Sequence, residues 1–337
     1  MDKVTLHLDE ARALSQQCLL ANGCDDANAA ATTDVMIAAE GDGCPSHGLF
    51  RLPGYVTALR SGRVDGRADP SIERIASAVV RVDGRGGFAP LALARGRQPL
   101  IEAARENGIA ALSLAGIFHF AALWPEVEAI AQESLCALAV TSSRSLVAPA
   151  GGISALFGTN PMAFGWPRKD GPPMVFDQAV SVMAQGEVMI AARDGHELAP
   201  GVALDSEGRP TIDAKAAIDG VLLPFGGYKG SGIGMMIELL AAGLLGENFA
   251  FEASEQTPND GGPGRGGELM IAMDPARFGD AVGWLAHSEQ FFERMLAQEG
   301  VRLPGARRHA NRARIMATGF SIPTALHETI LHLTEAG

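Results

Sequence analysis

Glycine most constrains what this 337-residue chain can fold into. Its 41 glycines stand mostly in short clusters between apolar runs and form no repeat. Because glycine breaks regular elements and supplies turns, this pattern predicts many short helices and strands joined by loops. Hydrophobic residues make up 47 % of the chain, enough for a substantial core. The sequence therefore favours a loop-rich α/β enzyme, built as one large domain or two.

Charge and composition exclude several classes of protein. The 39 acidic and 27 basic residues give a net charge of −12, which argues against a nucleic-acid surface. No apolar run approaches the ~18 residues of a membrane helix, and the first residues lack the order of a signal peptide. The four cysteines have no metal-site spacing, so no metal is expected. We expect a soluble cytoplasmic protein with free thiols and no membrane partner.

Apolar periodicity and turn residues predict the secondary structure. Helices are predicted at 9–22, 26–40, 49–60, 90–107, 124–133, 181–192, 275–298 and 323–333, with one more after Gly234 that ends near 245. Strands are predicted at 71–82, 109–115, 135–141, 174–177 and 269–273. Glycine-rich or polar stretches are predicted as a turn at 83–87, an excursion from the core at 194–220 and a loop at 253–267.

The stretch 41–51 holds the first candidate site. A predicted helix stops at Gly41, and Ser46, His47 and Arg51 follow. If this segment is helical, His47 and Arg51 share one face, because they are four residues apart. Histidine exchanges a proton near neutral pH, and arginine offers a planar fork to a carboxylate. A 2-oxo or 2-imino acid needs such a pair. The alternative is an ordinary helix start capped by Ser46.

No dinucleotide fingerprint of the Rossmann type is present. The sequence at 83–88 is a poor match, and the one at 230–235 fails at Met235. Lys229 lies among glycines that could hold a phosphate, or in a solvated turn. The arginines within 302–308 could meet a phosphate or form a solvated loop. The sequence around His119 does not decide whether this histidine is functional or structural.

Six motifs in order nevertheless resemble one family. They are Ser46-His47-Gly48 with Arg51, His119-Phe120, the loop 157–161, Asp177-x-Ala179, the loop 226–230 and the run from Arg302 to Arg307. Together they resemble the malate/L-lactate dehydrogenase family of NAD(P)-dependent oxidoreductases outside the Rossmann class. Residues 119–128 are most similar to its Δ1-piperideine-2-carboxylate/Δ1-pyrroline-2-carboxylate reductases, which reduce cyclic 2-imino acids to L-pipecolate or L-proline with NADPH.

The resemblance implies an α/β fold of the family's own type. Its cofactor domain would have a largely antiparallel sheet, with helical N- and C-terminal parts. Residues 1–118 would form the N-terminal helical part for substrate and dimerisation, 119–300 the NADP-binding domain, and 301–337 a segment completing the cofactor site. The protein would be a homodimer that acts on a small cyclic imino acid or 2-oxo acid.

The resemblance also implies roles for individual residues. His47 would be the proton donor, oriented by Ser46 and Glu187. The residues implied to hold or surround the substrate are Arg51, Thr159, Gln185 and Gly186. The residues implied to contact the dinucleotide are His119, Phe120, Ala121, Ala122, Leu123, Asp177, Gln178, Ala179, Tyr228, Lys229, Arg302, Leu303, Pro304, Gly305, Ala306, Arg307 and Arg308. The arginine run favours NADPH, because a 2′-phosphate needs cations.

Two other functions stay open at this point. The first is the same fold acting on a 2-hydroxy acid such as malate, lactate or ureidoglycolate. The second is a non-catalytic dinucleotide-binding protein. Glu187 also departs from the family, since the reductases carry aspartate there, and the extra methylene changes how far its carboxylate reaches.

Overall fold

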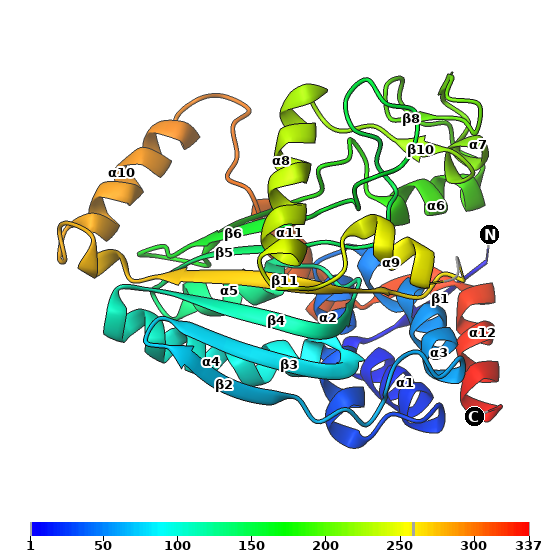
Figure 1. Ribbon diagram of the computed structural model, residues 1–337, viewed down its shortest axis with the longest axis horizontal. Helices are drawn as coiled ribbons and strands as arrows, with labels where there is room; N and C mark the ends of the chain where they lie inside the picture. Colours follow the sequence, from blue (N-terminus) through cyan, green and yellow to red (C-terminus); the bar gives the residue numbers. More distant parts are fainter. Residues whose placement is uncertain (1, 258–259, 337) are drawn as a thin grey trace.

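An open seven-stranded sheet runs through the centre of the molecule in the computed structural model, which describes residues 2–257 and 260–336 (Figure 1). Its strands, in sheet order, are β2 (Ser71–Ala76), β3 (Val79–Phe88), β4 (Ile109–His119), β11 (Gly264–Met273), β5 (Cys136–Thr141), β6 (Met162–Trp166) and β7 (Met174–Gln178). Only β3 and β4 pair in parallel; every other neighbouring pair in this sheet is antiparallel. The predicted largely antiparallel, non-Rossmann sheet is confirmed.

The parallel pair requires a crossover, and α4 (Ala89–Asn107) supplies it. Pro90 stands in the first turn of α4, and Gly108, with φ of +83°, ends it. Together with α5 (Trp124–Gln132), α4 covers one face of the sheet. The largest hydrophobic cluster lies in this layer.

The opposite face of the sheet is covered by α8 (Tyr228–Glu238), which continues as a π-helical turn, η3 (Leu239–Gly243). Alternate residues of β11 serve the two layers: Met270 packs with the α4 side, whereas Leu269 packs with Ile237 of α8. This alternation follows from the two-residue period of a strand.

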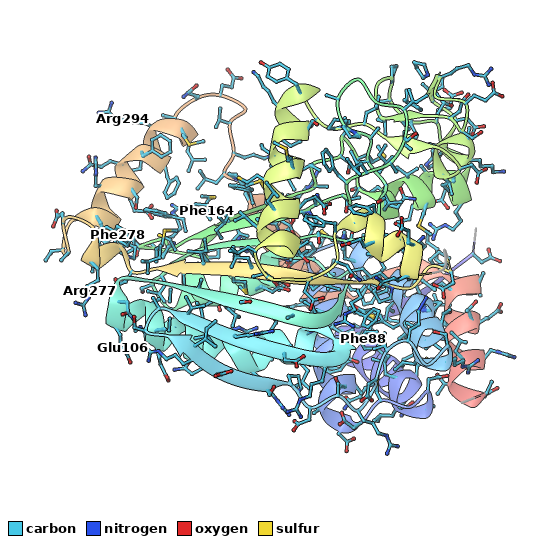
Figure 2. The ribbon with its side chains drawn as sticks, viewed as in Figure 1. Phe88, Glu106, Phe164, Arg277, Phe278 and Arg294 are labelled. Carbon is cyan, nitrogen blue, oxygen red and sulfur yellow. The ribbon has the colours of Figure 1, made fainter. Side chains whose placement is uncertain are left out.

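The two ends of the chain form a separate helical part. It contains α1 (Leu8–Ala21), α2 (Asp26–Gly41), α3 (Leu52–Arg60) and α12 (Thr324–Glu335), which share one hydrophobic cluster. There, β1 (Lys3–Leu6) pairs antiparallel with β12 (Phe320–Pro323). Phe88, at the end of β3, lies 4.8 Å from the Tyr55 ring of α3 and joins the sheet to this part (Figure 2). The predicted helical ends are confirmed.

Residues 194–220 were predicted to lie outside the core, and this was wrong. They include β8 (Ala203–Leu204), β9 (Pro210–Thr211) and α7 (Ala214–Ile218); β10 (Val221–Leu222) completes a three-stranded sheet. With α6 (Gln185–Asp194) these elements enclose their own apolar cluster, whose buried members include Leu198 and Val202. The few apolar residues here are spaced too irregularly to show a period.

Three other predicted elements were also wrong. The strand 71–82 with its turn at 83–87 is instead a hairpin that turns at 77–78, and β3 runs through the glycines with a shift in register. The loop 253–267 is partly regular, because α9 (Ala250–Gln256) and the start of β11 enter it; residues 258–259 lie outside the described part. The helix 275–298 is shortened to α10 (Trp284–Leu296) after a single turn, η4 (Pro275–Arg277).

Local hydrogen bonds explain the shortened helix. The Asp280 carboxylate accepts the backbone N–H groups of Val282 and Gly283 at 3.1 and 2.9 Å, which competes with helical pairing. Figure 2 shows Arg277, Phe278 and Arg294 in this segment, at the end of the sheet far from the helical part.

The helix α11 (Ala306–Thr318) was not predicted. The division of the chain at 118 and 300 stays a prediction; the large sheet draws strands from both sides of residue 118.

Candidate active site

A cleft of about 710 Å³ lies where the ends of β4 and β7 meet the segment after α2, the start of α6 and the start of α11. Most of the residues expected to act in one site line it. They are Ser46, His47, Arg51, His119, Phe120, Ala121, Ala122, Leu123, Thr159, Asp177, Gln178, Ala179, Gln185, Glu187, Arg307 and Arg308. This volume suits a large ligand, since pockets for small molecules measure roughly 300–1,000 Å³.

The segment that carries His47 and Arg51 is not the single helix that would place them on one face. It forms two short 3-10 turns, η1 (Pro45–His47) and η2 (Leu49–Arg51), separated by Gly48. The buried Glu40 carboxylate accepts the Leu49 N–H at 2.7 Å. A Cβ on Gly48 would lie 2.1 Å from that carboxylate, so glycine is required at this position. Both side chains still reach the cleft.

His47 is held on one side and open on the other. Its Nδ1 pairs with Ser46 Oγ at 3.0 Å, and its ring lies at 76° to the Trp124 ring with a centroid distance of 6.1 Å. Nε2 makes no hydrogen bond to the described residues, so it is left for the cleft. Burial, the Arg51 charge and His119 together lower the pKa of His47 to about 3. The imidazole is therefore neutral at pH 7.

Arg51 is held in place by its neighbours, but none of the described residues supplies a carboxylate to pair with its charge. Its Nε donates to the Ser46 carbonyl at 2.8 Å, and its guanidinium lies 5.0 Å from the centre of the Phe120 ring. Within residues 2–257 and 260–336 no carboxylate forms an ion pair with it. Burial lowers the pKa of Arg51 only to about 10, so the charge stays at pH 7. A Cβ on Gly186 would lie 2.9 Å from Arg51 Nη2, so this glycine leaves room for the guanidinium.

The Thr159 segment is fixed by its neighbour. Asn160 is fully buried, has a φ of +41°, and donates from Nδ2 to Glu238 Oε1 at 2.8 Å. The Thr159 carbonyl accepts the Val180 N–H at 2.8 Å.

Glu187 is exposed and lines the cleft, and no hydrogen bond in the described structure joins it to His47. Its role as an orienting group stays a prediction.

Asp177 organises the start of α5. Its Oδ2 accepts the backbone N–H groups of Leu123 and Trp124, both at 3.0 Å. Those donors belong to the unpaired first turn of a helix, where a carboxylate is favoured. Asp177 thereby fixes the segment 119–123 against β7, and burial raises the pKa of this carboxyl. It lines the cleft as well.

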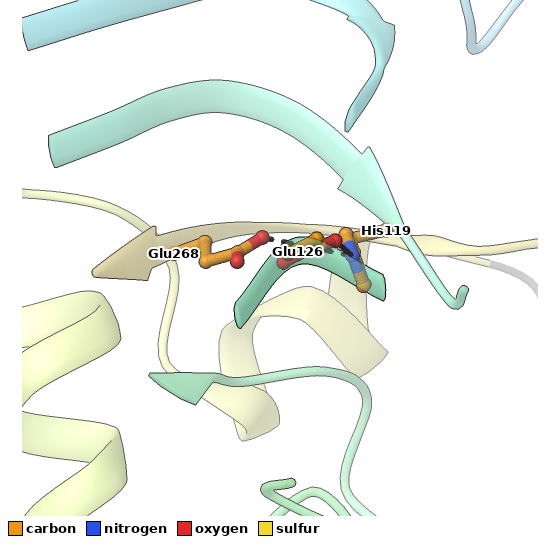
Figure 3. A group of neighbouring side chains, drawn as sticks. All are labelled: His119, Glu126 and Glu268. Carbon is orange, nitrogen blue, oxygen red and sulfur yellow. Dashed lines mark hydrogen bonds and ion pairs between the residues drawn. The ribbon is translucent and has the colours of Figure 1, made fainter. Parts of the chain in front are cut away.

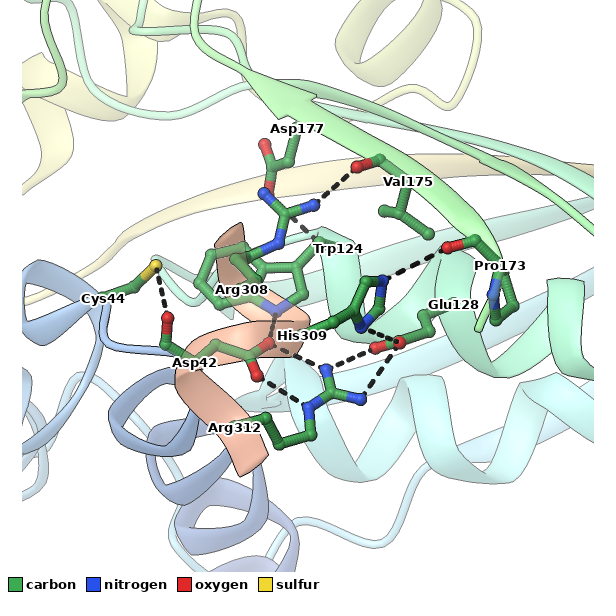
Figure 4. Close-up of polar contacts among 10 residues, drawn as sticks. All are labelled: Asp42, Cys44, Trp124, Glu128, Pro173, Val175, Asp177, Arg308, His309 and Arg312. Carbon is green, nitrogen blue, oxygen red and sulfur yellow. Dashed lines mark hydrogen bonds and ion pairs between the residues drawn. The ribbon is translucent and has the colours of Figure 1, made fainter. Parts of the chain in front are cut away.

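The arginines of 302–308 divide between two adjoining hollows. Arg307 and Arg308 line the cleft and also a second hollow of about 290 Å³, shared with Arg302, Leu303, Pro304 and Gly305. Arg308 donates to the Val175 carbonyl at 2.7 Å, and its guanidinium lies 5.1 Å from the centre of a ring of Trp124. Figure 4 shows these contacts beside an ion-pair network around Arg312.

Three expected cofactor residues line neither hollow: Tyr228 and Lys229, at the exposed start of α8, and Ala306, the first residue of α11. Other residues of the cleft were not predicted as site residues. Trp124, Thr141, Ser143 and Ser181 line it. Thr141 ends β5, and polar residues at strand ends are a signal that could have found it.

Known proteins resemble this chain over nearly its whole length. A Δ1-pyrroline-2-carboxylate reductase of Ancylobacter novellus is 44 % identical over 338 residues, covering 100 % of this chain and 99 % of its own. A (2R)-3-sulfolactate dehydrogenase (NADP⁺) of Chromohalobacter salexigens is 44 % identical over 95 % of each chain. The crystal structure of Δ1-piperideine-2-carboxylate reductase from Pseudomonas syringae superposes with a TM-score of 0.92 at 42 % identity, covering 98 % of this chain and 99 % of that one.

The family assignment agrees with the motifs. Among the described residues no helix combines the length and hydropathy needed to cross a bilayer. The malate/L-lactate dehydrogenase family matches residues 6–331. The family predicted from six short motifs is therefore confirmed, and the chain belongs to the malate/L-lactate dehydrogenase family of oxidoreductases.

Proposed function

We propose that this protein reduces cyclic 2-imino acids, converting Δ1-pyrroline-2-carboxylate to L-proline and Δ1-piperideine-2-carboxylate to L-pipecolate with NADPH. The observation that carries the proposal is the guanidinium of Arg51, which has no carboxylate partner among the described residues, beside the neutral imidazole of His47. An acid with a carboxylate next to a C=N bond would pair with the first and present its nitrogen to the second. Similarity to reductases of both imines supports the substrate class.

The residues of the cleft fit a dinucleotide. A cofactor of this kind carries a negative pyrophosphate, and Arg307 and Arg308 offer cations where the cleft meets the second hollow. The apolar segment Phe120–Leu123 offers a surface for a flat ring. The same arginines support NADPH over NADH, because the 2′-phosphate adds charge for them to meet. When bound, the reduced nicotinamide supplies the hydride for C2 of the substrate.

The chain's own groups would handle the carboxylate and the proton. Arg51 would hold the carboxylate, assisted by Thr159, with Gln185 and Gly186 shaping the pocket. That carboxylate would offset the Arg51 charge, one of the causes that lower the pKa of His47. Substrate binding would therefore favour protonation of His47, and Nε2 would place the proton on the ring nitrogen. A general acid of this kind is worth about 10²–10⁴-fold.

We also propose a homodimer. The α8–η3 helix exposes apolar side chains that a monomer would leave in water: Tyr228 is 75 % exposed, Met235 55 %, Leu239 55 % and the following Leu244 65 %. Sedimentation equilibrium is expected to give twice the chain mass. Leu239→Glu with Leu244→Glu should give monomers, and an unchanged mass in that variant would place the contact elsewhere.

A second candidate is oxidation of a 2-hydroxy acid, favoured by the sulfolactate dehydrogenase relative at the same 44 % identity. Its carboxylate would use Arg51 and its hydroxyl His47 in the same way. The two candidates differ in the direction in which His47 moves a proton. In imine reduction His47 gives a proton to the ring nitrogen, whereas in oxidation of a hydroxy acid it takes a proton from the hydroxyl.

The experiment follows NADPH absorbance with both cyclic imines beside pyruvate and 3-sulfopyruvate, with NADH in parallel. Turnover of the imines with NADPH at least tenfold above the open-chain acids is expected. Turnover confined to the open-chain oxo acids would support the second candidate. NADPH binding by fluorescence without turnover of any of the four would contradict both.

A further inference from the structure

Two glutamates lie buried behind the cleft, and the groups around them do not neutralise two negative charges. Glu126 of α5 and Glu268 of β11 are 3 % and 0 % exposed, and both face His119 at the end of β4 (Figure 3). His119 Nε2 lies 3.3 Å from Glu126 Oε1 and 3.6 Å from Glu268 Oε2. Among the described residues, neither carboxylate has a lysine or arginine within ion-pair distance. Two buried negative charges in contact with one imidazole are not stable.

The carboxylate oxygens that lack hydrogen bonds also indicate that the two glutamates are not both charged. Glu126 Oε2 and both oxygens of Glu268 are buried and accept no hydrogen bond from the residues that the structure describes. Buried carboxylate oxygens normally accept several, and leaving them unpaired is expensive. The two carboxyl groups are in direct contact, because a side-chain hydrogen bond between them, formed once one carries a proton, lowers the pKa of Glu126 and raises that of Glu268.

We propose that Glu268 remains protonated at neutral pH and donates a hydrogen bond to Glu126, which in turn accepts the Nε2–H of His119. This arrangement leaves His119 neutral, with its proton on Nε2 and Nδ1 as an acceptor. His119 lines the cleft, and Nδ1 has no partner among the described residues. Nδ1 would therefore receive an N–H donor in the cleft. Resting on the proposed function, that donor is the carboxamide of the nicotinamide, and Glu126 and Glu268 act as positioning residues.

The charges around the cluster agree with this protonation state. Burial raises the pKa of Glu126 to about 7 and raises that of Glu268 well above its usual range. The hydrogen bond between them lowers the pKa of Glu126 and raises that of Glu268. Burial also lowers the pKa of His119. The other charged groups that face the cluster are Asp177 of β7, which raises both glutamate pKa values, and Arg97 of α4, which lowers that of Glu126. Tyr55 of α3 also faces Glu126.

A bound cation is the other way to neutralise two carboxylates. Three side chains could hold one here. We favour the proton because His119 Nε2 and Glu126 Oε1 already lie at hydrogen-bond distance. Metal analysis of the purified holoenzyme separates the two: a stoichiometric metal, lost in Glu268→Gln, would overturn the proposal.

The shared proton can be observed without cofactor or substrate. Infrared difference spectra between wild type and Glu268→Gln at pH 8 should show the C=O band of a protonated carboxylic acid in the wild type only. Glu238→Gln is the matched control, since the Glu238 carboxylate is also buried but accepts three N–H groups, from Gly158, Asn160 and Ala250. Its substitution should leave the acid band in place. Absence of the band from wild type would overturn the proposal.

Unfolding gives a second readout. The folded protein binds the Glu268 proton above pH 4.5 and the unfolded chain does not, so folding stability from this group falls as pH rises through that range. Relative to Glu268→Gln, wild type should therefore lose stability between pH 5 and pH 8. A constant difference across this range would contradict a retained proton.

NADPH affinity tests the positioning role. Glutamine at 268 still donates to Glu126, whereas leucine cannot. Glu268→Gln is expected to bind NADPH about tenfold tighter than Glu268→Leu, the worth of one hydrogen bond to a charged group. Equal affinities would overturn the positioning role. Failure of imine turnover together with a retained acid band would instead overturn the proposed function and leave the shared proton standing.

Discussion

Arg312 of α11 holds Asp42, the residue after α2, with two hydrogen bonds, from Nε at 2.7 Å and from Nη2 at 2.9 Å. It also donates twice to Glu128 of α5, at 3.1 and 2.8 Å (Figure 4). Asp42 in turn accepts the Trp124 indole N–H at 2.7 Å. The Trp124 side chain meets His47 and Arg308, so one network fixes both the proton donor and a cofactor arginine.

Replacing Arg312 should therefore lower both stability and cofactor affinity. Arg312→Lys loses the planar fork and removes one of the two hydrogen bonds that Arg312 donates to the fully buried Asp42 carboxylate. We expect a loss of about 2 kcal/mol in the free energy of unfolding, below the 3–5 typical of a broken buried pair because the Arg312 side chain is 35 % exposed. The Kd for NADPH should rise several-fold.

Arg168→Lys is the matched control for that prediction. Arg168 holds Glu289 with two hydrogen bonds at 2.7 and 2.8 Å and lines neither hollow. It should lose stability without a change in the NADPH Kd. Denaturant unfolding and fluorescence titration give both values, and an equal loss of affinity in the two variants would show that the Arg312 effect is not specific to the site.

The pH dependence of stability should report the neutral state of His47. Its folded pKa, about 3, lies below the unfolded value of 6.5, so the unfolded chain binds more protons between these values. Stability from this group is then complete above pH 6.5 and is lost as pH falls toward 3. His47→Gln removes this dependence, so the variant should gain stability relative to wild type between pH 7.5 and pH 5. Parallel stability curves for the two proteins would contradict it.

The order of the six family motifs along the chain predicted the site residues better than the four-residue spacing of His47 and Arg51 did. The histidine and arginine of 41–51, the 119–123 segment, Asp177 and Arg307 with Arg308 do line one cleft. However, His47 and Arg51 would share one face only if the segment were a single helix, and it is not one. The glycine between them ends one turn and starts another, because the buried Glu40 carboxylate occupies the space that a side chain would need.

The contacts missed from the sequence are those between distant segments. Asp42 and Arg312 are 270 residues apart, and nothing periodic connects them. α11 was missed because Ile315 is its only buried residue in the described structure, so it lacks an apolar stripe. Its place is set by the ion pairs of Arg312 instead. Glu126 was part of a recognised motif, but its partner Glu268 comes from a strand far along the chain.

Arg51→Lys should separate substrate binding from cofactor binding. Lysine keeps the charge but loses the planar fork and the stacking on Phe120. We expect the KM for the imino acid to rise roughly 10–100-fold, the worth of one or two charge-assisted hydrogen bonds, while the Kd for NADPH stays within about twofold. Steady-state kinetics and fluorescence titration give the two values. A parallel rise in both would contradict the assignment of Arg51 to the carboxylate.

Arg307 should decide between the two nicotinamide cofactors. It is exposed, lines both hollows and has no ion-pair partner among the described residues, whereas Arg308 also holds the Val175 carbonyl and so has a structural role. Arg307→Gln is expected to raise the NADPH Kd about tenfold, by loss of one charge-assisted contact, and to leave the NADH Kd nearly unchanged. Arg314→Gln, on the exposed side of the same helix and outside both hollows, is the control and should change neither value. Equal losses for the two cofactors in Arg307→Gln would place Arg307 at the pyrophosphate that they share, and selection for NADPH would then have to come from Arg302.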